Sequence, residues 1–295
     1  MQGMIVYHYD AFTQIPNQGN PAGVVFDADH FDESTMLEIA RKVGFNETVF
    51  VQTSSVATVQ LRYFTPGHEI NLCGHATMAA IYGLQTRGYL DGISDLTIET
   101  KAGVLPITLS TDSSEQLKIR MQQSEPQFVA FKGDEERLMQ SIGLTMEDWD
   151  SRYPIVYGST GTWTLLIPIR TLGAFGLMRP DSAQFPALLT EMPRASLHPF
   201  GFETAYSDTL MHARHFSSPY SGTIEDPVTG TASGVMGAYY LTYMEPELEQ
   251  LSFQVEQGHE IQRDGRVQVE VSRTDLGMSV YVSGHAVFVK EMTLL

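Results

Sequence analysis

The sequence predicts an α+β protein built from two similar halves. Its 295 residues are too many for one ordinary single-core domain and suit two domains of about 100 to 150 residues. Segments typical of strands and of helices are mixed without strict alternation, which disfavours a doubly wound parallel sheet. In addition, two distant stretches share one order of elements and similar residues at a helix start.

In the first half, period-two alternation predicts strands and apolar residues at helical spacing predict two helices. The first helix is capped by Asp32 or Ser34, whose side-chain oxygens can accept free amides, and it stops at Gly44, where glycine tolerates a left-handed backbone. The second helix runs from Gly74 to about Gly88. The expected strands are residues 4–9, 22–26, 48–51, 59–64, 97–109 and 117–121.

The second half is expected to reuse this mixture of elements. Helical spacing predicts helices over about 181–191 and 230–244. The expected strands are residues 160–169, 210–216, 251–256, 266–272 and 278–290.

The two halves look like diverged copies of one unit. In the first half, an aromatic strand ending in Phe64 leads through a loop into GHAT at residues 74–77. In the second half, an aromatic strand ending in Phe216 leads through a loop into GTAS at residues 230–233. Such a pair of copies is expected to place one active site in the cleft between them.

Charge and cysteine content exclude several classes of partner. The 35 acidic and 18 basic residues give a formal charge of −17, which repels phosphate backbones and anionic membranes. No apolar run approaches the roughly 20 residues of a membrane span, and the first residues do not resemble a signal peptide. We therefore expect a cytoplasmic protein without nucleic-acid or membrane partners. The single cysteine, Cys73, cannot form an internal disulfide, and no metal is expected.

The helix starts and one acidic connector could carry catalytic chemistry. Amides at Gly74 and at residues 230–232 should lie unpaired at the positive end of a helix dipole, which suits a carboxylate or an enolate-like oxyanion. The alternative is that these residues merely begin helices. Glu47 lies in a short connector with apolar flanks, which suits a general acid and base. The alternative is a solvated loop carboxylate.

Two further segments carry titratable residues. Asp226 precedes a proline that favours extended backbone, so Asp226 and Glu225 should point in different directions, one towards the cleft and one holding a loop. The helix dipole should keep His75 largely neutral, which suits hydrogen-bond donation or proton shuttling; the alternative is a polar cap. His212 and His215 should lie on opposite faces of a strand, so no metal site is expected there.

Five sequence blocks occur in order along nearly the whole chain. They are DAFT (10–13) with GNPAGVV (19–25), NETVFV (46–51), RYFTPGHEINLCGHATMAA (62–80), EDPVTGTASG (225–234) and EQGHEIQRDG (256–265). Together they resemble the phenazine-biosynthesis PhzF-like isomerase family. The resemblance implies a diaminopimelate epimerase-like fold, in which each half is a mostly antiparallel sheet wrapped round a central helix. The expected halves are residues 1–120, with the last strand (280–295) packed on them, and residues 121–279.

The resemblance also implies the roles of individual residues. The catalytic residues would be Glu47, as acid and base, His75 and Asp226. The substrate-binding residues would be Asn20, Cys73, Gly74, Gly230, Thr231 and Ala232. The phenazine enzyme of this family works without a cofactor and the family commonly forms homodimers, so the resemblance implies both properties here.

The expected function is a cofactor-independent isomerase or epimerase that moves a proton on a small anionic or carboxylate-bearing substrate. A two-thiol racemisation is excluded because the chain has one cysteine. A mixed Cys73/Glu47 or Glu47/Asp226 pair stays open, as do metal-dependent hydrolysis and a catalytically silent small-molecule binding protein of the same fold. Side chains so close in sequence rarely meet, so we do not expect His75 to activate Cys73 as a nucleophile. The resemblance places Cys73 where the epimerase relatives keep a catalytic cysteine, and we interpret it as a relic that can still contact the ligand.

Overall fold

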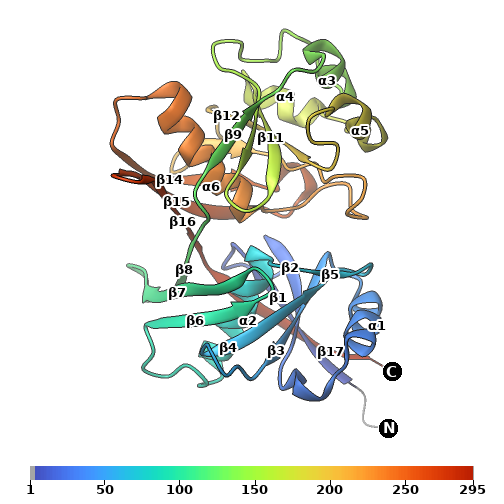
Figure 1. Ribbon diagram of the computed structural model, residues 1–295, viewed down its shortest axis with the longest axis vertical. Helices are drawn as coiled ribbons and strands as arrows, with labels where there is room; N and C mark the ends of the chain where they lie inside the picture. The colour runs from blue at the N-terminus through green and yellow to red at the C-terminus, as the bar shows by residue number, and fades with distance from the viewer. Residues whose placement is uncertain (1–3, 295) are drawn as a thin grey trace. The chain divides into compact units, whose positions relative to one another are not determined.

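The computed structural model describes residues 4–294 and divides into two compact units (Figure 1). Unit 1 consists of two segments, the chain up to Gln122 and the chain from Ser283 onwards, and unit 2 is Gln123–Val282. Each unit is a mostly antiparallel sheet around one buried central helix, α2 in unit 1 and α6 in unit 2. The predicted α+β class is therefore confirmed.

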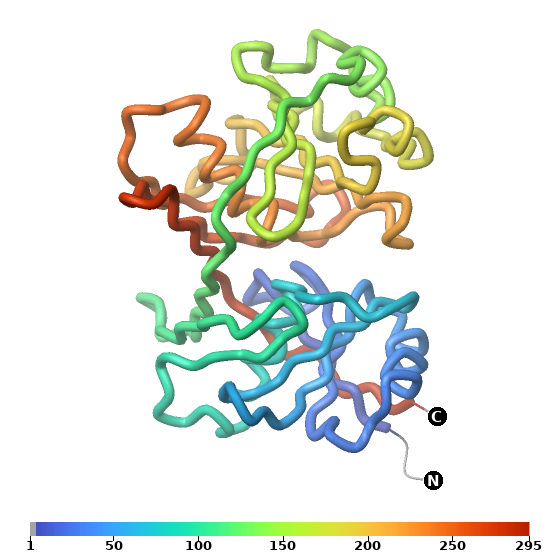
Figure 2. The backbone as a smooth tube through the Cα atoms, viewed as in Figure 1, coloured from blue at the N-terminus to red at the C-terminus, as the bar shows by residue number. Residues whose placement is uncertain are grey.

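Unit 1 is a mixed sheet with two helical crossovers. Its strands are β1 (Met4–Ala11), β2 (Asn20–Val25), β3 (Glu47–Gln52), β4 (Val59–Phe64), β5 (Glu69–Ile70), β6 (Asp95–Thr100), β7 (Gly103–Thr111), β8 (Leu117–Gln122) and β17 (Ala286–Leu294). Most neighbours are antiparallel, but β2 pairs with β3 and β4 pairs with β6 in parallel. Because β17 pairs with β1, the red C-terminal segment runs beside the blue first strand in Figure 2.

The helices of unit 1 begin and end largely as predicted. A short 3₁₀ turn (Ala28–His30) precedes α1 (Glu33–Val43), which begins where Asp32 accepts a hydrogen bond from the Thr35 amide at 2.8 Å and ends at Gly44, with φ at 73°. The central helix α2 (Gly74–Thr86) is buried along most of its length. Apolar residues of α1 and of the sheet form a core between α1 and the sheet.

Unit 2 has more helices, and most of them are short. Its helices are α3 (Glu135–Ser141), α4 (Leu172–Leu177), α5 (Phe185–Leu188) and α6 (Gly230–Tyr239), with 3₁₀ turns at Ser182–Gln184 and His259–Ile261 and a π-helical turn at Tyr240–Met244. Its strands are β9 (Gln127–Ala130), β10 (Val156–Ser159), β11 (Trp163–Pro168), β12 (Ser196–Gly201), β13 (Met211–Ala213), β14 (Gln250–Gln257), β15 (Gly265–Thr274) and β16 (Gly277–Gly284). Across residues 4–294, no helix has the length and apolarity that a membrane crossing needs.

The strand pairing of unit 1 recurs in unit 2. Pairs β1–β2, β2–β3, β3–β4, β4–β6 and β6–β7 alternate between antiparallel and parallel. Pairs β10–β11, β11–β12, β12–β13, β13–β14 and β14–β15 alternate in the same order. In both central helices a hydroxyl bonds the N-cap carbonyl: Thr77 to Cys73 at 2.7 Å in α2, and Ser233 to Thr229 at 2.9 Å in α6. The predicted internal repeat is confirmed.

Several predicted boundaries were wrong. Residues 97–109 belong to two strands, because Gly103, with φ at 120°, allows a tight turn at the start of β7. Residues 278–290 likewise divide between β16 and β17, and 160–169 holds a strand only from 163. The helix expected over 181–191 is a 3₁₀ turn followed by the single turn α5, and the end of 230–244 is π-helical.

Candidate active site

Strand β3 and helix α2 bring Glu47 and His75 together in unit 1. Glu47 is the first residue of β3 and His75 is the second residue of α2. The Oε2 atom of Glu47 lies 3.1 Å from Nε2 of His75, and the two side chains are 18% and 7% exposed. The contact has the distance of an ion pair, but Oε2 makes no hydrogen bond of good geometry. A carboxylate oxygen with unused acceptor capacity therefore lies buried against the His75 ring, on a side chain that is 18% exposed.

Asn20 holds the opposite edge of the His75 ring. It begins β2 and is fully buried, with Nδ2 3.1 Å from Nδ1 of His75. Parallel pairing sets Ala22 opposite Glu47, so Asn20, two residues earlier, faces the same side of the sheet as Glu47. Because Asn20 contacts Nδ1, the other ring nitrogen, Nε2, is the one that faces the Glu47 carboxylate.

Cys73 contacts His75, contrary to our expectation that these neighbours would not meet. Its Sγ atom lies 3.4 Å from Nδ1 and 3.8 Å from Nε2 of His75. The reason is local: Cys73 is the N-cap of α2 with extended backbone, at φ −143° and ψ 117°, so its side chain lies against the first turn. Burial raises the pKa of the Cys73 thiol, and its other neighbours do not reverse that effect. The thiol is therefore uncharged at neutral pH.

The expectation that His75 is largely neutral was also wrong. Burial disfavours its charged form, but the contacts with Cys73 and Glu47 outweigh burial and raise the pKa of His75 well above its usual value. A helix terminus changes the energy of a charge by about 1 kcal/mol or less. Opposite unit charges about 4 Å apart gain about 4 kcal/mol at an effective dielectric constant near 20, so the Glu47 carboxylate outweighs the helix dipole.

In unit 2, Asp226 is held against the start of α6. The Thr229 hydroxyl donates to Oδ2 of Asp226 at 2.5 Å. Gln257 spans the same turn, donating to the Asp226 carbonyl at 2.8 Å and accepting from the Thr229 amide at 3.1 Å. Glu225 instead makes two hydrogen bonds with Arg214, at 2.8 and 2.6 Å. The two neighbouring acids therefore have different partners, as predicted.

The predicted site residues fall into two groups. Asn20, Glu47, Cys73, Gly74 and His75 come together around the first turn of α2. Gly230, Thr231 and Ala232 form the first turn of α6, three residues after Pro227 and close to Asp226. That both groups act on one substrate stays a prediction.

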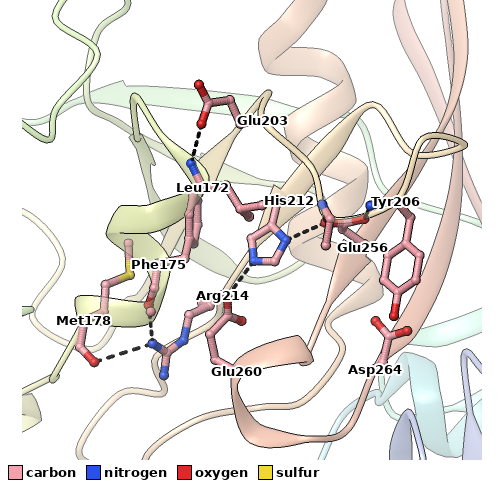
Figure 3. A network of polar contacts seen from close by, with 12 residues as sticks. Leu172, Phe175, Met178, Glu203, Tyr206, His212, Arg214, Glu256, Glu260 and Asp264 are labelled. Atoms are coloured by element: carbon pink, nitrogen blue, oxygen red, sulfur yellow. Dashed lines mark hydrogen bonds and ion pairs between the residues drawn. The ribbon is translucent and has the colours of Figure 1, made fainter.

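Sequence reasoning missed a buried charged network in unit 2 (Figure 3). His212 lies between two carboxylates, with Nδ1 2.6 Å from Glu256 and Nε2 2.9 Å from Glu260. Burial opposes charge on His212, yet both carboxylates raise its pKa. As predicted, His215 faces elsewhere, and its Nδ1 lies 3.1 Å from Nδ1 of His198. The block EQGHEIQRDG, which supplies Glu256, Gln257 and Glu260, was the available signal.

These contacts support acid–base chemistry in unit 1 and positioning in unit 2. A partly accessible carboxylate beside a proton-bearing imidazole can accept and return a proton. The free amides of a helix start can hold an anionic group nearby. In unit 2, Gln257 and Arg214 instead fix the loop that leads into α6.

Comparison with known proteins identifies relatives over the whole chain. The model of the phenazine biosynthesis-like protein family (PhzC-PhzF) matches residues 9–292. An uncharacterized isomerase of Bacillus subtilis, YfhB, is 49% identical over 283 residues, which are 96% of each chain. The trans-2,3-dihydro-3-hydroxyanthranilate isomerase of Pseudomonas chlororaphis is 28% identical over 288 residues, 96% of this chain and 97% of that one.

A solved structure agrees with the fold in detail. The crystal structure of a PhzF-family phenazine biosynthesis protein from Bacillus anthracis superposes with a TM-score of 0.97 at 52% identity, covering 100% of both chains. The family and these named relatives indicate an isomerase. The chain belongs to the phenazine biosynthesis-like PhzC-PhzF family.

Proposed function

We propose that this protein is a cofactor-independent isomerase that moves a proton on a small carboxylate-bearing substrate, with Glu47 as acid and base. One observation carries the proposal. The Oε2 atom of Glu47 lies 3.1 Å from the His75 ring, makes no hydrogen bond of good geometry, and belongs to a side chain that is 18% exposed. A base needs such an oxygen, because a carboxylate that is fully hydrogen-bonded is a weaker proton acceptor.

In this mechanism, Glu47 removes a proton from a carbon next to an unsaturated or carbonyl group. The electron pair of the broken C–H bond moves into the conjugated system, and the protonated Glu47 then gives the proton back at another carbon. His75 keeps the carboxylate in place and offers its Nε2 proton to developing negative charge, while Asn20 fixes the ring. Proton and electrons are balanced without any added group.

The substrate class follows from the donors near Glu47. The chain carries a formal charge of −17, so its overall field does not attract anions. An anionic substrate must therefore be held by local donors, namely the His75 ring and the first-turn amides of α2, which have no acceptor within the helix. The similarity to an isomerase of trans-2,3-dihydro-3-hydroxyanthranilate makes cyclic unsaturated carboxylates the first candidates.

Deuterium incorporation tests the proposal. Candidate carboxylates, including trans-2,3-dihydro-3-hydroxyanthranilate, are incubated with the protein in heavy water and analysed by mass spectrometry. Wild type should introduce deuterium at carbon, and Glu47→Gln should lower the rate at least about 100-fold, because general acid–base catalysis contributes about 10²–10⁴-fold. Glu99→Gln is the matched control, since Glu99 is also a partly buried strand carboxylate but bonds Ser54.

Three outcomes would contradict the proposal. Tight binding of a carboxylate without any exchange would identify a silent binding protein. Unchanged exchange in Glu47→Gln would move the base elsewhere. Loss of exchange in Cys73→Ala, with Glu47→Gln still active, would make the thiol the proton carrier.

A further inference from the structure

We infer that Glu47, Cys73 and His75 form a binding site for one divalent transition-metal ion, with Zn²⁺ as the best-matched ion, and that this ion blocks proton transfer. Among the described residues, these three bring a carboxylate oxygen, a thiol sulfur and a ring nitrogen within 4.8 Å of one another. His75 lies in contact with both of the other residues, Glu47 and Cys73.

The distances between the donor atoms are close to those around a tetrahedral ion. Zinc lies about 2.3 Å from a thiolate sulfur and about 2.0–2.2 Å from nitrogen and oxygen ligands, so its sulfur–nitrogen and nitrogen–oxygen separations are about 3.6 and 3.4 Å. Here Sγ of Cys73 is 3.8 Å from Nε2 of His75, and Nε2 is 3.1 Å from Oε2 of Glu47.

The site needs a small adjustment to close. Sγ of Cys73 lies almost as near to Nδ1 as to Nε2 of His75, at 3.4 and 3.8 Å, so the thiol must turn about its Cα–Cβ bond to share an ion at Nε2. This rotation moves only the Cys73 side chain. The backbone of Cys73, the N-cap residue of α2, and the helix itself stay in place. Glu47 can follow with its Oε2 atom, which has no hydrogen bond to lose.

The mixed donor set selects the kind of ion. Mg²⁺ and Ca²⁺ prefer sites made of oxygen atoms, whereas sulfur, nitrogen and oxygen together suit Zn²⁺ and Co²⁺. Binding releases both the thiol proton and the Nε2 proton of His75 to solvent, and the thiolate and carboxylate then neutralise the ion. Asn20 contacts the second ring nitrogen, and by turning its amide it can accept the Nδ1 proton and orient the ring, as supporting residues do in metal sites.

The effect on activity rests on the proposed function. The atoms that would hold the ion, Oε2 of Glu47 and Nε2 of His75, are those assigned to proton transfer. An ion between them occupies the acceptor oxygen and displaces the ring proton. Zinc should therefore inhibit exchange, and a chelator should restore it.

Metal binding is tested without substrate, on full-length protein first treated with a chelator. Zn²⁺ is titrated in competition with a chromogenic chelator, and Co²⁺ is titrated while the near-ultraviolet spectrum is recorded. We expect one ion per chain and a cobalt–thiolate charge-transfer band. Cys73→Ser, His75→Gln and Glu47→Gln should each weaken zinc binding at least about tenfold, since even supporting residues are worth about 10–100-fold. His68→Gln replaces an exposed histidine in the turn between β4 and β5; it is the control and should bind as wild type does.

The outcomes separate this inference from the proposed function. Zinc binding that is unchanged in Cys73→Ser, or cobalt binding without a thiolate band, would overturn the site. Circular dichroism of each variant shows that a loss of binding is not a loss of fold. If zinc binds as expected but wild type exchanges no substrate, the site stands and the proposed function fails. If wild type exchanges substrate and no zinc binds, the reverse holds.

Discussion

Replacing Glu256 by glutamine should destabilise unit 2 by about 3 kcal/mol at neutral pH. The Glu256 carboxylate is fully buried and lies 2.6 Å from each of His212 Nδ1, the Thr209 hydroxyl and the Ala205 amide. Figure 3 shows its contact with His212. Burial alone would raise the pKa of Glu256, but these partners lower it from 4.5 to about 2. A pKa difference of about 2.5 corresponds to about 3 kcal/mol, at 1.36 kcal/mol for each pH unit.

The loss should depend on pH in a defined direction. Because the folded-state pKa of Glu256 lies below its unfolded value, the stabilisation is complete above about pH 4.5 and disappears as the pH falls through about 2. At pH 3 the unfolded carboxyl is mostly protonated while the folded one is mostly ionised, which leaves about 1 kcal/mol. The stability difference between wild type and variant should therefore narrow by about 2 kcal/mol from pH 7 to pH 3.

Urea unfolding followed by tryptophan fluorescence measures this difference. The chain has two tryptophans, Trp149 and Trp163, and both lie in unit 2, so the signal reports that unit. Glu247→Gln, an exposed site of the same unit, is the control and should leave the free energy of unfolding unchanged within about 0.5 kcal/mol. A cost below about 1 kcal/mol at pH 7, or an equal cost at pH 3, would refute the reasoning.

Other substitutions test further contacts. Asp32→Ala should lower the free energy of unfolding by about 1 kcal/mol, because α1 loses its N-cap acceptor. An unchanged urea midpoint, measured by far-ultraviolet circular dichroism, would contradict this. Glu225→Leu should cost about 3–5 kcal/mol by tryptophan fluorescence, because it leaves the Arg214 guanidinium, only 6% exposed, without its charged partner. If Arg214→Met added to that variant recovers none of the loss, the unpaired charge is not its cause. Gly83→Val should prevent α2 from packing, since even a Cβ there would lie 2.7 Å from an aromatic ring; a variant that melts as wild type does would disprove this.

The sequence predicts elements best where their ends have local chemical causes. Asp32 and Gly44 bound α1 because one side chain caps amides and one backbone can turn left-handed, and both effects act within a few residues. Helix α3 carries the same kind of signal, because Asp134 accepts from the Arg137 amide, but our sequence reasoning missed it. The N-cap residues of the short helices α4 and α5 provide no side-chain cap, and the apolar side chains of these helices pack into the unit 2 core. Period-two patterns also cannot show where a strand turns back, so 97–109 was read as one segment.

The candidate site was predictable in its members but not in its contacts. The resemblance names Glu47, His75 and Asn20, which are 27 or more residues apart in the sequence. The sheet and α2 bring them together in space. Their meeting depends on the parallel pairing of β2 with β3, a long-range contact that periodicity does not reveal. The charge on His75 was mispredicted for the same reason, because the dipole of its own helix is visible in the sequence and the carboxylate at 3.1 Å is not.

Heavy-water exchange with wild type and Glu47→Gln tests the central claim most directly. The account predicts that wild type transfers deuterium to carbon of a cyclic unsaturated carboxylate, that Glu47→Gln is at least about 100-fold slower, and that Glu99→Gln matches wild type. Equal rates for wild type and Glu47→Gln would contradict the assignment of Glu47 as the base.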